Sequence, residues 1–171
     1  EQALRLVTNL RHERVAEMLI RLSRSEGTVP EAVRPTIRSL GLLAEAPLAA
    51  MCNRGVAEED LDELLVAIEL MGYAGHTNET SDILLRIAHE KYNGIAKTEQ
   101  AKREALRALG QWGRQGTGTL SGFLQRAGGL SASAREGLVD GLTSSQLSDS
   151  ILAKMMYSLA RRGIQRQLTI Q

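Results

Sequence analysis

The sequence contains few aromatic residues and few prolines. Aromatic residues make up 3% of the chain, and only three prolines occur in 171 residues. The apolar residues are mainly Leu, Ala, Ile, Val and Met, and Leu, Ala and Met favour helices. Because proline interrupts helical hydrogen bonding, its scarcity leaves long stretches free to form helix. We therefore expect an all-α protein.

The chain also has almost no net charge and a single cysteine. Its 21 basic and 20 acidic side chains give a formal net charge of +1, so no overall field draws it to nucleic acid or to a membrane. Cys52 cannot form an internal disulfide, which indicates a reducing compartment or at least a fold that needs no disulfide. No apolar run approaches the ~20 residues of a membrane span. We expect an intracellular protein, cytoplasmic or organellar with mitochondria among the candidates, that is not secreted and has no membrane partner.

Internal repetition is the main positive feature of the sequence. Glycines followed closely by an aliphatic residue recur about every 28–39 residues, near the period of two-helix repeats. Glycine adopts the left-handed conformation that ends helices, and the aliphatic residue can fold back on the last turn. The glycines predicted to end the first helix of each hairpin are Gly27, Gly55, Gly94, Gly129 and Gly163.

A second helix is predicted in each unit. Its end is expected near another glycine, and these glycines are Gly41, Gly72, Gly110 and Gly141. Apolar pairs spaced i, i+3 place one buried face on these helices. The pairs are Ile37 and Leu40, Ile68 and Met71, and Leu106 and Leu109. Ser133 and Glu136 have the spacing of a capping box at the start of the fourth such helix.

These patterns predict one domain over residues 1–171 that forms a right-handed α-solenoid of about four to five antiparallel helical hairpins. The approximate units are 1–41, 42–72, 73–113, 114–145 and an incomplete 146–171.

Two segments resemble known helical repeats. The segment ALRALGQWG resembles the second helix of a HEAT hairpin, and the chain is similar to the HEAT and armadillo class. The last unit, SSQLSDSILAKMMYSLARRGI, resembles the helix of octotricopeptide and RAP-associated repeats of organellar RNA-handling proteins. Tyr157 stands where that family commonly has an aromatic residue, often tryptophan. The second resemblance implies an association with RNA.

Patterns for catalysis or metal binding are weak. His12, His76 and His89 lie on separate segments, and Asn93 occupies the position where a zinc-protease helix would need a second histidine after His89. Cys52 lies in an apolar stretch, where a buried structural role is favoured. We therefore expect no catalytic residue, metal, cofactor or small-molecule substrate.

Basic residues recur near the predicted ends of the first helices. Cations there complement the helix dipole, but in a stack of repeats they would also line one edge that phosphates could contact. This predicted basic edge consists of Arg24, Arg54, Lys91, Arg126, Arg161 and Arg162, and further basic residues such as Arg114 could widen it.

The last unit is too short to contain a full second helix. Three apolar residues near its end, Ile164, Leu168 and Ile170, would then face solvent or a partner. We expect this C-terminal interface to be covered by another chain or by further sequence.

These features predict a non-catalytic helical-repeat scaffold that binds a protein partner as a subunit of a larger assembly. The alternative is an organellar RNA-associated helical-repeat protein that uses the basic edge. Because aromatic platforms for base stacking are scarce, reading of RNA one base per repeat is not expected.

Overall fold

The computed structural model describes residues 13–75, 77–89, 94–126, 130–145, 148, 150–151, 153–155 and 157. All regular structure in these residues is helical, which confirms the predicted all-α class. The α-helices are α2 (Glu13–Glu26), α3 (Val33–Leu40), α4 (Glu45–Ala57), α5 (Leu61–Ala74), α6 (Asn78–Ala88), α7 (Glu99–Gln111), α8 (Thr117–Arg126) and α9 (Ala132–Ser144). Short 3-10 helices join some of them: η1 (Gly41–Ala44), η2 (Gly94–Lys97) and η3 (Gly113–Gly116).

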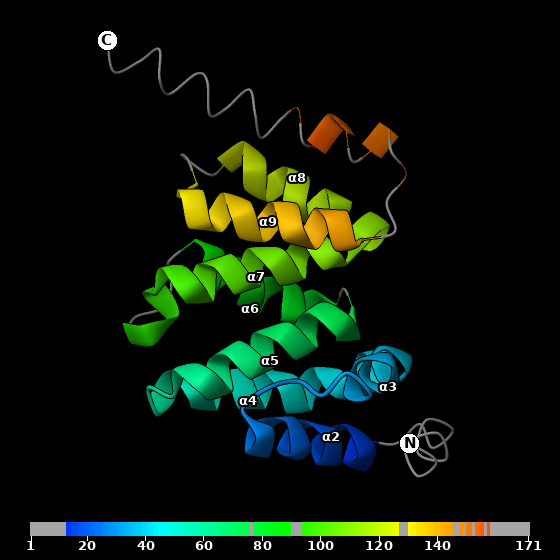
Figure 1. The fold of residues 1–171 in the computed structure, drawn as a ribbon, viewed down its shortest axis with the longest axis vertical. Helices are drawn as coiled ribbons and strands as arrows, with labels where there is room; N and C mark the ends of the chain where they lie inside the picture. Colours follow the sequence, from blue (N-terminus) through cyan, green and yellow to red (C-terminus); the bar gives the residue numbers. More distant parts are fainter. Residues whose placement is uncertain are drawn as a thin grey trace.

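Helices that are next but one in the sequence lie side by side (Figure 1). The helices α3, α5, α7 and α9 contact one another in that order, and α2, α4 and α6 do the same. Within pairs that follow each other in the chain, α2 packs on α3, α4 on α5 and α6 on α7. The molecule is therefore elongated, with α2 at one end and α9 near the other.

The apolar faces predicted for the second helices are buried. Six residues at the i, i+3 positions are at most 4% exposed: Ile37, Leu40, Ile68, Met71, Leu106 and Leu109. The core continues along the molecule and includes Phe123 of α8, whose ring centroid lies 4.7 Å from that of His89. Burial of these faces is the main source of stability, because short helices are marginal in water without tertiary packing.

The predicted glycine stops are confirmed at Gly27 and Gly41. Gly27 follows α2 with φ +65°, and Gly41 follows α3 with φ +53°. Gly94 also has a positive φ, of +64°, but it begins η2, whereas α6 ends earlier, at Ala88. Gly129 and Gly163 lie outside the described residues.

The predicted stop at Gly55 is wrong, because this glycine lies inside α4. The helices predicted to end near Gly72, Gly110 and Gly141 do so, since α5, α7 and α9 end two, one and three residues later, but these glycines are themselves helical. Each of the four glycines lies where another segment approaches the helix closely. A Cβ atom on Gly55 would lie 2.9 Å from the backbone nitrogen of Leu64, and one on Gly110 would lie 2.8 Å from that of Leu142. Left-handed residues occur instead just beyond the ends of α4, α5 and α7, at Glu59, Gly75 and Gly113.

Helix starts are set by polar caps. Asp60 caps α5 by accepting a hydrogen bond from the backbone of Glu63, a role that aspartate commonly takes at helix starts. The predicted capping box at Ser133 is wrong, since α9 is capped by Ser131, which accepts a hydrogen bond from the backbone of Ala134. No helix among the described residues is long and apolar enough to cross a membrane.

Candidate functional site

Two residues of the predicted basic edge have described side chains, Arg24 and Arg54. Arg126 is the last residue of α8, but its side chain is outside the described part. The remaining members of the basic edge and the predicted C-terminal interface lie outside the described residues: Lys91, Arg161, Arg162, Ile164, Leu168 and Ile170.

Arg24 and Arg54 converge on one carboxylate, that of Glu63. Arg24 lies in the last turn of α2 and Arg54 in the last turn of α4, whereas Glu63 lies in the first turn of α5. Nη2 of Arg24 is 3.0 Å from Oε2 of Glu63. Nε of Arg54 donates a 2.7 Å hydrogen bond to Oε1, and its Nη2 donates to the same atom. The cluster therefore joins three helices.

The carboxylate is the buried member of this cluster. Its side chain is 1% exposed, whereas those of Arg24 and Arg54 are 44% and 42% exposed. Oε2 has no hydrogen-bond partner among the described residues, so the approach of Arg24 is an ion pair without aligned hydrogen-bond geometry. The hydrogen bond to Glu63 raises the pKa of Arg54. Because a buried carboxylate requires charged partners, both arginines have a structural role.

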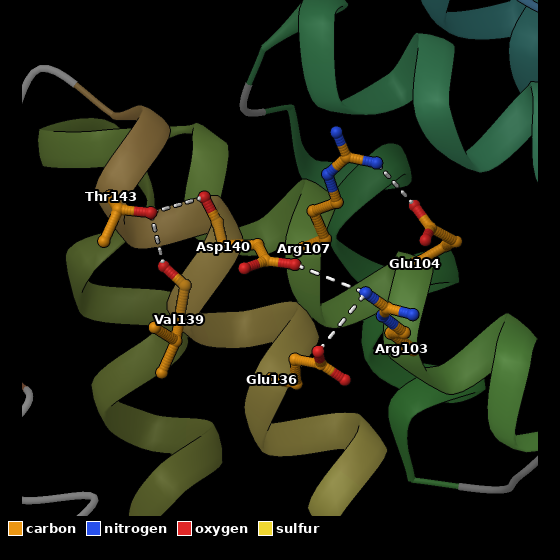
Figure 2. Close-up of polar contacts among 7 residues, drawn as sticks. All are labelled: Arg103, Glu104, Arg107, Glu136, Val139, Asp140 and Thr143. Atoms are coloured by element: carbon orange, nitrogen blue, oxygen red, sulfur yellow. Dashed lines mark hydrogen bonds and ion pairs between the residues drawn. The ribbon is translucent and has the colours of Figure 1, made fainter.

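A second charged group lies where α7 and α9 meet (Figure 2). Nη2 of Arg103 is 3.4 Å from Oδ2 of Asp140 and 3.8 Å from Oε1 of Glu136. Arg107 pairs within its own helix instead, with its Nη1 atom 3.2 Å from Oε2 of Glu104. These arginines therefore have acidic partners and add little free positive charge to the surface.

Arg34 and Glu69 form a third pair, between α3 and α5. Nη2 of Arg34 lies 3.2 Å from Oε1 of Glu69, and the guanidinium carbon lies 5.3 Å from the ring centroid of Tyr73. Burial is the main cause of a raised pKa at Glu69, opposed by the charge of Arg34. The Arg34 guanidinium group therefore lies over one face of the Tyr73 ring.

A cleft of about 520 Å³ lies where α5, α7 and α9 end. Its lining includes Arg38 near the end of α3, Gln111 at the end of α7, Arg114 and Gln115 of η3, and Ser145 after α9. No acidic side chain of the described residues lines it. We call it the arginine cleft.

The two arginines of this cleft differ from those described above. Arg38 and Arg114 are exposed and pair with no acid in the part of the chain that the structure describes. Trp112 also lines the cleft; it is 7% exposed, and its Nε1 donates a 3.1 Å hydrogen bond to the carbonyl oxygen of Met71. From the sequence, Arg114 was predicted only to widen the basic edge, and no role was predicted for Arg38. The cleft could not be predicted, because it forms between helix ends that are far apart in the chain.

Cys52 is buried, as predicted, and burial raises its thiol pKa to about 12. A thiol with this pKa is almost wholly protonated at neutral pH, so it behaves as a small apolar side chain. Among the described residues, no group of three or more His, Cys, Asp or Glu side chains has a metal-binding arrangement.

Comparison with protein-family models, with curated proteins and with solved structures finds no match for this chain. The resemblances to HEAT and armadillo repeats and to octotricopeptide repeats therefore stay predictions.

Proposed function

We propose that this chain is a non-catalytic helical-repeat scaffold that binds a protein partner within a larger assembly. In this proposal the helix pairs are the antiparallel hairpins of a right-handed α-solenoid. The contacts of α3, α5, α7 and α9 in sequence order support it, because each unit of a solenoid touches only its neighbours. The intracellular location expected from the sequence belongs to the same proposal.

One observation carries the binding role: large apolar side chains are exposed at the α2 end of the molecule. Met18 and Leu22 lie one turn apart on α2 and are 52% and 40% exposed. Leu42 and Leu43 of η1, which packs against α2, are 72% and 39% exposed. We call these four residues the apolar end. Exposed surfaces that carry several large apolar side chains are typical of protein interaction sites.

The RNA-associated alternative receives less support from the basic edge. A phosphate track needs several unpaired cations along one line. Arg24 and Arg54 share the buried charge of Glu63, so this part of the edge carries a net charge of about +1 rather than +2.

The test is recovery of the tagged full chain from its native cells, with and without ribonuclease treatment. We expect a defined protein partner to co-purify with the chain even after ribonuclease treatment. This partner should no longer co-purify with the Met18→Asp, Leu42→Asp double variant. Ala132→Asp is the matched control, since it places the same acid at an exposed apolar position in the first turn of α9. Recovery of RNA without a protein partner would overturn the proposal. Equal loss of the partner from the Ala132→Asp control would overturn it too.

A further inference from the structure

The arginine cleft collects hydrogen-bond donors that have no partner in the described structure. Arg38 and Arg114 each bring a guanidinium group, and Gln111 and Gln115 bring side-chain amides. Elsewhere in the described residues, the arginines next to Glu63, Glu69 and Asp140 form ion pairs with these acids of the same chain. Two guanidinium groups that pair with no acid of the described residues, in a cleft that no described acid lines, favour an anionic ligand, since guanidinium forms paired hydrogen bonds with carboxylates.

The helix ends around the cleft do not cancel this preference. Helix C-termini carry partial negative charge on their last carbonyl groups. Two of these carbonyls already accept hydrogen bonds: that of Met71 accepts from Gly75 and Trp112, and that of Leu142 accepts from the hydroxyl of Ser145. These hydrogen bonds reduce the negative potential of the two carbonyls toward the cleft, whereas both guanidinium groups remain exposed.

The cleft suits a peptide better than a nucleic acid. Single-stranded nucleic acid is bound by a basic groove together with exposed aromatic faces on which its bases stack. Trp112 is 7% exposed, and Arg34 lies 5.3 Å from the centre of the Tyr73 ring. The glutamine amides of the cleft can both donate to and accept from a peptide backbone, and its volume of about 520 Å³ accommodates a short segment.

We propose that the arginine cleft binds an acidic peptide segment of the protein partner, with Arg38 and Arg114 each contacting a carboxylate and the glutamines contacting the peptide backbone. This inference rests on the proposed scaffold function and assigns the partner a chemistry. The cleft and the apolar end are then separate contact points for one partner, the first giving charge specificity and the second apolar contact area.

The test is fluorescence anisotropy with the full chain and three labelled probes: hexaglutamate, hexaglutamine and hexauridylate. We expect hexaglutamate to bind and hexaglutamine to bind at least about tenfold more weakly. Arg38→Gln and Arg114→Gln should each weaken hexaglutamate binding about tenfold, since each removes charge-assisted hydrogen bonds. Arg135→Gln is the matched control, because Arg135 is also exposed but lies at the opposite end of α9, and it should change binding less than about twofold.

Three results would overturn the inference. The first is hexaglutamine binding as tightly as hexaglutamate, and the second is an equal loss of hexaglutamate affinity in Arg135→Gln. The third is hexauridylate binding that Arg38→Gln and Arg114→Gln abolish. Circular dichroism checks that the variants fold, as expected for exposed side chains. The native-cell recovery separates the two proposals. If the partner is lost from the apolar-end variant but retained by the Arg38→Gln, Arg114→Gln double variant, the cleft inference fails and the scaffold proposal stands.

Discussion

A Cβ atom on Gly141 of α9 would lie 2.1 Å from the carbonyl oxygen of Arg107 in α7. One turn earlier, a Cβ atom on Gly137 would lie 2.3 Å from the carbonyl oxygen of Arg103. The two helices therefore meet backbone to backbone along this line. Arg103 contacts Asp140 and Glu136 across the same interface, so close backbone packing and ion pairing act together there (Figure 2).

We expect Gly141→Ala to destabilise the protein by about 1–3 kcal/mol, because the added methyl group meets backbone atoms that cannot rotate away. Gly118→Ala is the control: nothing lies within 4 Å of a Cβ atom there, so replacing glycine in helix α8 should stabilise by up to about 1 kcal/mol. Urea unfolding followed by circular dichroism measures both free energies. Equal effects of the two substitutions would contradict the close approach of α7 and α9.

Glu63→Gln tests the cluster that joins α2, α4 and α5. We expect a loss of about 1–2 kcal/mol, since the charged hydrogen bonds disappear while both half-exposed arginines regain contact with water. Asp62→Asn removes an exposed carboxylate from the same turn and should cost about 0.5 kcal/mol or less. The measurement is the free energy of unfolding at neutral pH.

A double-mutant cycle isolates the contact between Glu63 and Arg54. The substitutions Glu63→Gln and Arg54→Met should be non-additive, with a coupling energy of about 0.5–3 kcal/mol. Additive costs would show that the two side chains do not interact in solution.

Glu69 should make stability depend on pH. Burial raises the pKa of Glu69 in the folded state above its ordinary value. The unfolded state then binds fewer protons between the two pKa values, so the contribution of this group is most favourable below the ordinary glutamate pKa of about 4.3 and is lost as pH rises through the folded pKa. We expect the stability of the wild type minus that of Glu69→Gln to fall as the pH rises above about 4.3. A difference that instead rises with pH would contradict the burial of Glu69.

Cys52 should be unreactive in the folded protein. Its thiol is fully buried and has a pKa of about 12, so both access and thiolate concentration are low. With Ellman's reagent near pH 8, we expect one thiol to react rapidly in denaturant and only at the rate of unfolding in buffer. As the chain has one cysteine, the reaction reports on this site alone. Rapid reaction in buffer would show that the region around α4 is open.

The helical class and the buried faces could be predicted from the sequence because they depend on local periodicity. Ile37 and Leu40 lie one turn apart, which places both on the same face of a helix whatever that helix later contacts. The burial of Cys52 followed similarly from its apolar neighbours. The helix ends at Gly27 and Gly41 were also predictable, because a left-handed glycine after an apolar helix is a local signal.

The sequence by itself determined that this chain forms amphipathic helices, and roughly where they begin and end. Only the tertiary structure decided which glycines adopt a positive φ at a turn and which allow another helix to approach closely. Gly113 adopts a positive φ, whereas Gly110, three residues earlier, lies inside α7 against α9. The tertiary structure also decided which arginines contact an acid, since Arg54 does and Arg38 lines a cleft with no acid among its described residues. The glycines and the arginines differ from the helical pattern for the same physical reason. Backbone approach and charge pairing depend on segments distant in sequence, whereas helical periodicity depends on neighbours within one or two turns.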